Sequence, residues 1–134
     1  MKLDIPQDAI TYQLIIELRR PVHVAVGRLG EVSFPIGRYV YTGSARRGVE
    51  ARVRRHLSPQ KRLHWHIDYL LASPRARVVE IRTFSDEECV VNRRTRGDIV
   101  VPGFGASDCH AGCGAHLKRM RSTRRLPASR RIAR

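Results

Sequence analysis

The segment 37–57, GRYVYTGSARRGVEARVRRHL, combines residue types that can handle phosphate. Tyr41 stands two residues before Gly43, and a glycine at a strand end leaves the approach free of a side chain. Arg52 stands four residues before His56, one helical turn away. Phosphodiester cleavage needs a tyrosine or histidine base, an arginine fork for phosphate, and a carboxylate that holds Mg²⁺ or Mn²⁺. The alternative is a buried strand with satisfied tyrosines beside a basic surface helix.

A helix over residues 48–57 is the element that would carry Arg52 and His56. Its apolar residues recur every four positions, at Val49, Val53 and Leu57. At about 100° per residue, Arg52 and His56 lie beside this stripe, at the boundary between core and solvent. We therefore expect the pair to form one wall of a cleft.

The remaining patterns predict a mixed α/β domain. Segments rich in β-branched and aromatic residues predict strands over 10–18, 37–43 and 76–84. Alternation around a glycine turn predicts a hairpin over 22–34. A helix is predicted over 63–73, and another follows Ser85, a suitable N-cap. Because the early strands are consecutive, the sheet is at least partly antiparallel.

Charge divides the chain into two parts. Its 134 residues carry a net charge of +14, with 26 Lys and Arg against 12 Asp and Glu. Residues 118–134 hold eight basic residues and no acidic one, so we expect a disordered basic tail after a folded domain of residues 1–117. This charge favours a polyanionic partner, and nucleic acid is the commonest. A ribosome-associated basic protein is the alternative.

The sequence also bears on where the protein acts. No apolar run approaches the ~20 residues that span a bilayer, and the N-terminus lacks the apolar core of a signal peptide. We therefore expect a cytoplasmic protein without membrane contact. Its three cysteines are then reduced thiols or metal ligands rather than disulfides.

Two of these cysteines lie in a glycine-rich segment that also contains histidines, CHAGCGAH. Cys109, Cys113 and His116 could bind a structural zinc ion, with His110 or Cys89 as the fourth ligand. The spacing differs from the paired CxxC pattern of zinc sites. We therefore favour a segment without zinc.

The order of the motifs resembles the GIY-YIG nuclease superfamily. In that family a tyrosine-x-glycine strand end precedes a helix with arginine and, one turn on, histidine or tyrosine. Tyr41-Thr42-Gly43, Arg52 and His56 match this order. The first motif of the family matches Ile10-Thr11-Tyr12, with isoleucine in place of glycine.

Further segments are similar to the Uri-type branch of this superfamily: WHIDYLL (65–71), Glu88-Cys89 and GFGASDC (103–109). The resemblance covers residues 10–117. It implies a small α/β scaffold with a central three-stranded antiparallel sheet flanked by helices. The long separation between Tyr12 and Tyr41 fits an extra hairpin near the N-terminus.

The resemblance also implies roles for individual residues. Glu88 matches the glutamate that holds one Mg²⁺ or Mn²⁺ ion. Arg52 would stabilise the phosphate in the transition state. Tyr41 or His56 would activate water, and Tyr12 would orient the water or the phosphate.

The implied function is a metal-dependent endonuclease that hydrolyses phosphodiester bonds in DNA, including branched or damaged DNA. Basic residues around the cleft and in the tail are expected to bind the DNA backbone: Arg46, Arg47, Arg55, Lys118, Arg119 and Arg121. The alternative function is a nucleic-acid-binding module on the same fold that does not cut.

Overall fold

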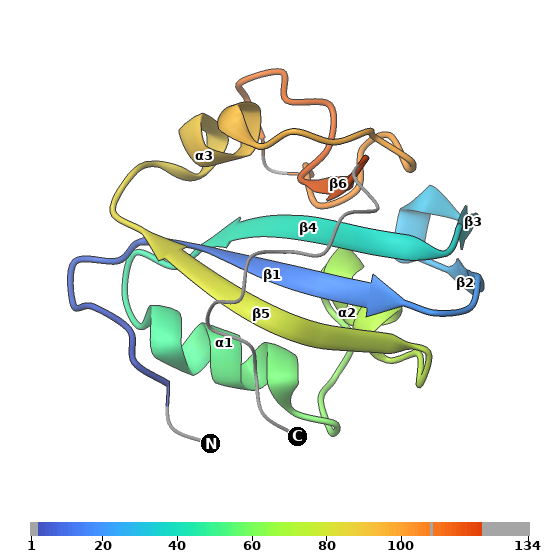
Figure 1. The fold of residues 1–134 in the computed structure, drawn as a ribbon, viewed down its shortest axis with the longest axis horizontal. Coiled ribbons are helices and arrows are strands. Elements are labelled where there is room, and N and C mark those ends of the chain that lie inside the picture. Colours follow the sequence, from blue (N-terminus) through green and yellow to red (C-terminus); the bar gives the residue numbers. More distant parts are fainter. Residues whose placement is uncertain (1–2, 108, 122–134) are drawn as a thin grey trace.

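The computed structural model of the chain describes residues 3–107 and 109–121 (Figure 1). Its strands are β1 (Thr11–Leu18), β2 (Val22–Ala25), β3 (Glu31–Phe34), β4 (Gly37–Ser44), β5 (Ala76–Phe84) and β6 (Leu117–Arg119). Its helices are α1 (Val49–Leu57), α2 (His66–Leu71) and α3 (Glu88–Arg94), and a short 3₁₀ helix spans Gly27–Leu29. This mixed α/β architecture confirms the predicted fold class.

The main sheet has four antiparallel strands in the order β5-β1-β4-β6. Strand β1 is central and pairs along its whole length with β4 on one side and β5 on the other. β2 and β3 form a separate two-stranded hairpin, as predicted for residues 22–34. Three strands were expected in the central sheet, and β6 adds the fourth because Leu117 pairs with Tyr41 at the edge of β4.

The disordered tail was expected to begin at residue 118, but this residue lies inside strand β6. The ammonium group of Lys118 donates hydrogen bonds to the carbonyls of Asn92 (2.6 Å) and Thr95 (2.9 Å). The first residues assigned to the tail are thus part of the sheet. The expectation of disorder for residues 122–134 lies outside the described residues.

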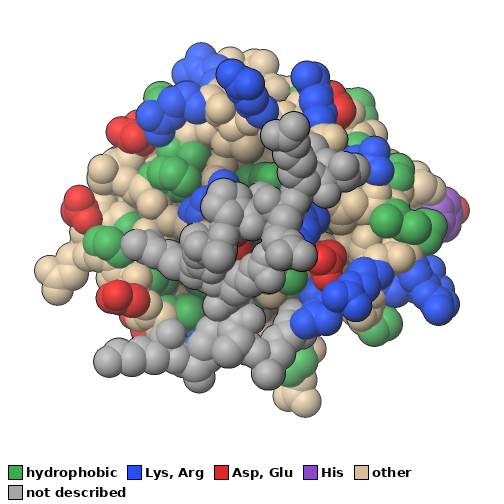
Figure 2. All heavy atoms as spheres, viewed as in Figure 1, with side chains coloured by type: hydrophobic (Ala, Val, Ile, Leu, Met, Phe, Trp, Pro, Cys, Tyr) green, Lys and Arg blue, Asp and Glu red, His purple; other side chains and the backbone are tan. Residues whose placement is uncertain are grey.

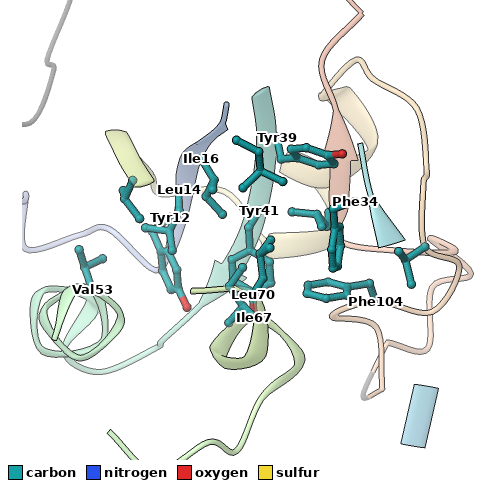
Figure 3. Packing of buried hydrophobic residues seen from close by; sticks show 14 of the residues in the cluster. Tyr12, Leu14, Ile16, Phe34, Tyr39, Tyr41, Val53, Ile67, Leu70 and Phe104 are labelled. Carbon is teal, nitrogen blue, oxygen red and sulfur yellow. The ribbon is translucent and has the colours of Figure 1, made fainter. Parts of the chain in front are cut away.

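One face of the sheet packs against α1 and α2. Alternate side chains of β1, including Tyr12, Leu14 and Ile16, point to this face because side chains alternate along a strand. Figure 3 shows them next to Val53 of α1 and the buried apolar residues of α2. Phe34, Tyr39 and Phe104 extend this core, with edge-to-face ring contacts at 5.7 and 6.1 Å between centroids. The core therefore places α1 beside the ends of β1 and β4.

α3 packs against the opposite face of the sheet, at β4 and β1, and Figure 1 shows α1 and α3 on opposite sides of the strands. Gln13 of β1 donates a hydrogen bond to the hydroxyl of Thr95, just after α3 (2.7 Å). The helix begins at Glu88 with Glu87 at the N-cap, so the predicted capping role of Ser85 is wrong. This start places Glu88 at the end of the helix that lies nearest to Ser44, the last residue of β4.

Positive charge is spread over the surface. In the view of Figure 2, Lys and Arg side chains occur at several places around the visible face, with Asp and Glu side chains between them. Several arginines pair with acids on the surface, including Arg94 with Asp86 and Arg54 with Glu50. None of the helices in residues 3–107 and 109–121 is both long enough and apolar enough to cross a membrane.

Candidate active site

A cavity of about 520 Å³ opens where the first residues of β1 and the last residues of β4 meet α1 and α3. Its walls come from strands, helices and the loop before β6, and are formed by Tyr12, Tyr41, Gly43, Ser44, Arg52, His64, Trp65, His66, Glu88, Cys89, Gly105, Ser107, Cys109 and His116. Four of the five residues predicted to be catalytic line this cavity: Tyr12, Tyr41, Arg52 and Glu88. The fold thus brings together these four residues, which are up to 76 positions apart in the sequence.

The fifth residue, His56, is buried behind Tyr12 and does not line this cavity, so the expectation that Arg52 and His56 together form one wall of a cleft is wrong. Its Nε2 atom is 2.6 Å from the hydroxyl of Tyr12, and both side chains are almost completely buried. Burial lowers the pKa of His56 to about 4, and the nearby positive charge of Lys61 acts in the same direction. The imidazole is therefore neutral at pH 7. Because burial raises the pKa of Tyr12, the phenol keeps its proton. When the proton of the neutral imidazole is on Nδ1, the atom that faces Asp68, the phenol donates its hydrogen bond to Nε2.

The other ring nitrogen of His56 faces Asp68. Its Nδ1 atom is 4.0 Å from Oδ1 of this carboxylate and has no hydrogen-bond partner among the described residues. Asp68 is completely buried, and Arg55 donates to both of its oxygens (3.0 and 3.1 Å). Burial alone would raise the pKa of Asp68, but these bonds and two backbone N–H donors lower it. An ionised carboxylate thus lies behind the His56–Tyr12 pair.

Gly43 makes room for the hydroxyl of Tyr12. The two residues pair across β1 and β4, and a Cβ atom at position 43 would lie 2.5 Å from the phenol oxygen of Tyr12. Any larger residue at this position would displace the ring. The glycine of the tyrosine-x-glycine motif therefore has a steric basis. Gly43 leaves the space that the ring of Tyr12, from the preceding motif, occupies.

Arg52 approaches the cavity from α1. Its guanidinium lies 4.5 Å from the ring centroid of Trp65 and donates a hydrogen bond to the backbone carbonyl of Ser44 (3.2 Å). Arg55 lies 4.4 Å from the centroid of the same ring. These contacts fix the guanidinium of Arg52, which forms no ion pair with a carboxylate in residues 3–107 and 109–121. An arginine held in this way can bind an anion that enters the cavity.

Glu88 reaches the cavity from the first turn of α3. Ser44 donates a hydrogen bond to its Oε1 atom (2.6 Å), and Nδ1 of His116 contacts Oε2. Burial alone would raise the pKa of Glu88, but the bonds from His116 and Ser44 lower it, so the carboxylate is ionised. The neighbouring Glu87 is exposed and lies 3.4 Å from the guanidinium of Arg46. Of these two acids, only Glu88 lines the cavity.

The three cysteines and His116 form a second cluster beside Glu88. The ligand atoms of Cys89, Cys109, Cys113 and His116 all lie within 4.8 Å of one another, so this thiol cluster could hold a metal ion. Two residues were candidates for the fourth ligand. Cys89, which is distant in the sequence, belongs to the cluster, whereas His110 is exposed and does not. Burial lowers the pKa of His116, but its hydrogen bonds to Glu88 and to the thiols raise it to about 9.

The residues predicted to bind DNA lie in different environments. Arg46 and Arg47 are exposed near the cavity end of β4. Arg55 is held by Asp68 and Trp65. The remaining basic residues make contacts within the chain: Lys118 with Asn92 and Thr95, Arg119 with the carbonyl of Ile36, and Arg121 with Asp98.

The sequence matches the model of a protein family that is described as a domain of unknown function, DUF123, over residues 11–133. The chain belongs to the DUF123 family. Neither the curated proteins nor the solved structures contain a match to it. The match spans both the cavity and the thiol cluster of this DUF123 protein.

Some site residues of this DUF123 protein could not be assigned from the sequence. Ser44 directly follows the tyrosine-x-glycine motif, but its bond to Glu88 depends on the packing of α3 against β4. His66 accepts a hydrogen bond from the backbone N–H of Gly105 (2.8 Å) and so ties the loop after α3 to α2. Asp68 accepts hydrogen bonds from the backbone N–H groups of His64 and Trp65 (both 2.9 Å). For His66 and Asp68, the WHIDYLL segment was the available signal in the sequence.

Proposed function

We propose that the protein is a divalent-metal-dependent endonuclease that hydrolyses phosphodiester bonds in DNA by a one-metal mechanism of the GIY-YIG type, as in the Uri branch. One observation carries this proposal. Tyr12, Arg52 and Glu88 come from β1, α1 and α3, and all three line a single cavity. Proton transfer, phosphate binding and metal binding would then take place at one site.

The surroundings of Glu88 suit a hard divalent cation. Its carboxylate is ionised, borders the cavity, accepts a hydrogen bond from the hydroxyl of Ser44, and lines the same cavity as Tyr12. Mg²⁺ and Mn²⁺ favour such oxygen ligands, with water filling the remaining positions. The contacts of Ser44 and His116 leave lone pairs on both carboxylate oxygens. When bound, the ion would polarise a phosphate oxygen and neutralise charge.

Arg52 is the residue that would bind the phosphate. Its planar guanidinium can donate two parallel hydrogen bonds to phosphate oxygens. The stack on Trp65 and the bond to the Ser44 carbonyl fix its position before substrate arrives. A positioned donor of this kind stabilises the charge that develops at phosphorus in the transition state.

Tyr12 and His56 provide a path for the proton. In our proposal the Tyr12 hydroxyl takes a proton from water while it passes its own proton to Nε2 of His56. The nearby carboxylate of Asp68 stabilises the imidazolium that forms. Because His56 acts through Tyr12, it is a positioning residue, and Tyr41 at the cavity wall orients the substrate or the water.

DNA is the proposed substrate because the net charge of +14 favours a polyanion. The cytoplasm is the proposed compartment because the three cysteines are free thiols.

Labelled linear, flapped and branched DNA should be incubated with the full chain and Mg²⁺, Mn²⁺ or EDTA. We expect strand cleavage with either metal and none with EDTA. Binding without cleavage in every metal would favour a non-catalytic binding module and overturn the proposal.

A further inference from the structure

Two spacings within the thiol cluster are close to those of a tetrahedral metal site. The sulfur atoms of Cys89 and Cys109 are 3.7 Å apart, and Nε2 of His116 is 4.0 Å from the Cys89 sulfur. A tetrahedral ion with metal–sulfur bonds of about 2.3 Å separates two sulfur ligands by about 3.8 Å. A disulfide would require sulfur atoms about 2.05 Å apart, and the cysteines are free thiols. The spacing therefore fits ligands around one ion.

The local backbone supports this arrangement of ligands. Cys89 stands in the first turn of α3, and the other two cysteines come from the loop before β6. Gly112 and Gly114 have positive φ angles of 72° and 83°, which allow the loop to turn on both sides of Cys113. Asn92 of α3 donates a hydrogen bond to the carbonyl of Ala115 (2.9 Å) and thereby fastens the loop to the helix.

The chemistry of the ligands selects the ion. Three thiols and one imidazole form a soft set, and a closed Cys₃His tetrahedron is typical of structural zinc. Four protein ligands leave no open position for water or substrate, which distinguishes this cluster from the carboxylate of Glu88, which borders the cavity.

His116 connects the cluster to the cavity through the two nitrogen atoms of one ring. Its Nε2 atom faces the thiols, and its Nδ1 atom contacts Oε2 of Glu88. Metal-bound histidines commonly donate their second N–H to a carboxylate, which fixes the orientation of both groups. Binding of an ion replaces the proton on Nε2 and leaves the Nδ1 proton for Glu88.

We propose that the thiol cluster binds one Zn²⁺ ion and that His116 links this ion to Glu88, holding the carboxylate in place in the cavity. The zinc site stands independently of any catalytic activity. Only the consequence for cleavage rests on the proposed function, in which Glu88 holds the catalytic cation.

The first test measures the metal directly. The full chain, purified under reducing conditions, should contain one zinc ion per chain by elemental analysis. Replacement of the zinc with Co²⁺ should give thiolate-to-cobalt charge-transfer bands and the strong visible bands of tetrahedral Co²⁺. Iron instead of zinc, no metal uptake, or a cobalt spectrum without thiolate bands would overturn the proposal.

Matched variants locate the site. Cys113→Ser should lose most of its zinc affinity, whereas His110→Ala, which changes an exposed neighbour outside the cluster, should keep it. Equal zinc affinity in Cys113→Ser and the unchanged protein would contradict the ligand set. If Cys113→Ser does not fold, the cobalt spectrum of the unchanged chain still decides whether thiolates bind the ion.

The second test measures the link to Glu88 without reference to cleavage. Glu88→Gln should weaken zinc affinity about 10- to 100-fold in competition with a chelator, as expected when the carboxylate partner of a metal-bound histidine is removed. Glu87→Gln changes the exposed neighbouring acid and should leave zinc affinity unchanged. Equal zinc affinity in the two variants would overturn the link. An inactive protein with intact zinc coupling would overturn only the proposed nuclease function.

Discussion

The thiol cluster forms part of the cavity wall, since Cys89, Cys109 and His116 also line the cavity. It differs from the predicted catalytic residues in the elements that build it and in the ligands it offers. Tyr12, Arg52 and Glu88 stand on regular strands and helices and present oxygen and nitrogen atoms. Two of the three cysteines stand in a glycine-rich loop and present sulfur. Hard cations such as Mg²⁺ would therefore bind at Glu88, and softer cations such as Zn²⁺ would bind at the thiol cluster. The contact between Glu88 and His116 joins the two regions.

The largest effect is expected at the acid that both regions share. Glu88→Gln should reduce Mg²⁺-dependent DNA cleavage about 10³-fold or more, because the loss of a metal ligand removes several kcal/mol of transition-state stabilisation. Circular dichroism and DNA binding should change little, because the amide has the same size as the carboxylate. The measurement is single-turnover cleavage of labelled DNA.

Glu87→Gln is the matched control for this change, because Glu87 is the exposed neighbour and does not line the cavity. Its cleavage rate should remain that of the unchanged protein. Normal cleavage by Glu88→Gln would exclude Glu88 from the mechanism. The contact between Glu88 and His116 would then have a structural role only.

Arg52 tests whether the cavity can act without any change in the thiol cluster. Arg52→Ala should lower the cleavage rate about 10²- to 10³-fold, the usual cost of removing one positioned donor to a charged transition state. Its zinc content should stay unchanged, because Arg52 makes contacts with Trp65 and Ser44 and none with the cluster among the contacts of the described residues.

Two further variants sharpen this result. Arg52→Lys keeps the charge but loses the planar fork, so it should recover only part of the rate. Arg54→Ala, in which the altered residue pairs with Glu50 on the exposed face of α1, should cleave normally. Equal rates for Arg52→Ala and Arg54→Ala would show that the cavity does not bind the phosphate.

Removal of one hydroxyl group tests the proposed proton path. Tyr12→Phe should lower cleavage about 10²-fold, because proton transfer by a positioned group contributes about 10² to 10⁴. Tyr39→Phe removes a hydroxyl that bonds the carbonyl of Pro35, away from the cavity, and should leave the rate unchanged. Rates are compared in single-turnover assays, and a Tyr12→Phe rate equal to that of Tyr39→Phe would exclude the phenol as a base.

The last expected effect falls on the free energy of unfolding rather than on the cleavage rate, and it depends on pH. The pKa of His56 is lowered to about 4 by burial and by Lys61, so the unfolded chain binds a proton here between about pH 6.5 and 4 and the folded chain does not. Stability from this group is fully present above about pH 6.5 and is lost as the pH falls towards 4, by an amount on the order of 3 kcal/mol.

The imidazole signals of His56 in an NMR titration give the direct measurement. They should report a neutral ring down to about pH 5. A midpoint near the ordinary histidine value would contradict the buried Tyr12–His56 pair, because a ring with that pKa would be exposed to solvent.

Much of the fold could be predicted because its elements have strong local patterns. β5 matches the predicted segment 76–84, and α1 begins one residue after the start of the predicted segment 48–57. β6 could not be predicted, since LKR has only three residues and the charge of a tail. Its strand conformation comes from pairing with β4, which is a tertiary effect.

Part of the candidate site could also be predicted from a local sequence pattern. The spacing of Arg52 and His56 on one helix indicated a shared face, and the structure places His56 behind Tyr12. The membership of Cys89 in the thiol cluster and the ion pair of Arg55 with Asp68 depend on packing between distant segments. Sequence spacing alone carries no information on such contacts.

The most direct test of the central claim is a crystal structure of the full chain with a short DNA duplex and Mn²⁺. We predict an anomalous manganese signal at the Glu88 carboxylate, a phosphate group bound by Arg52, and the scissile bond within the cavity. Manganese bound elsewhere, or DNA bound on a face that excludes the cavity, would contradict the account.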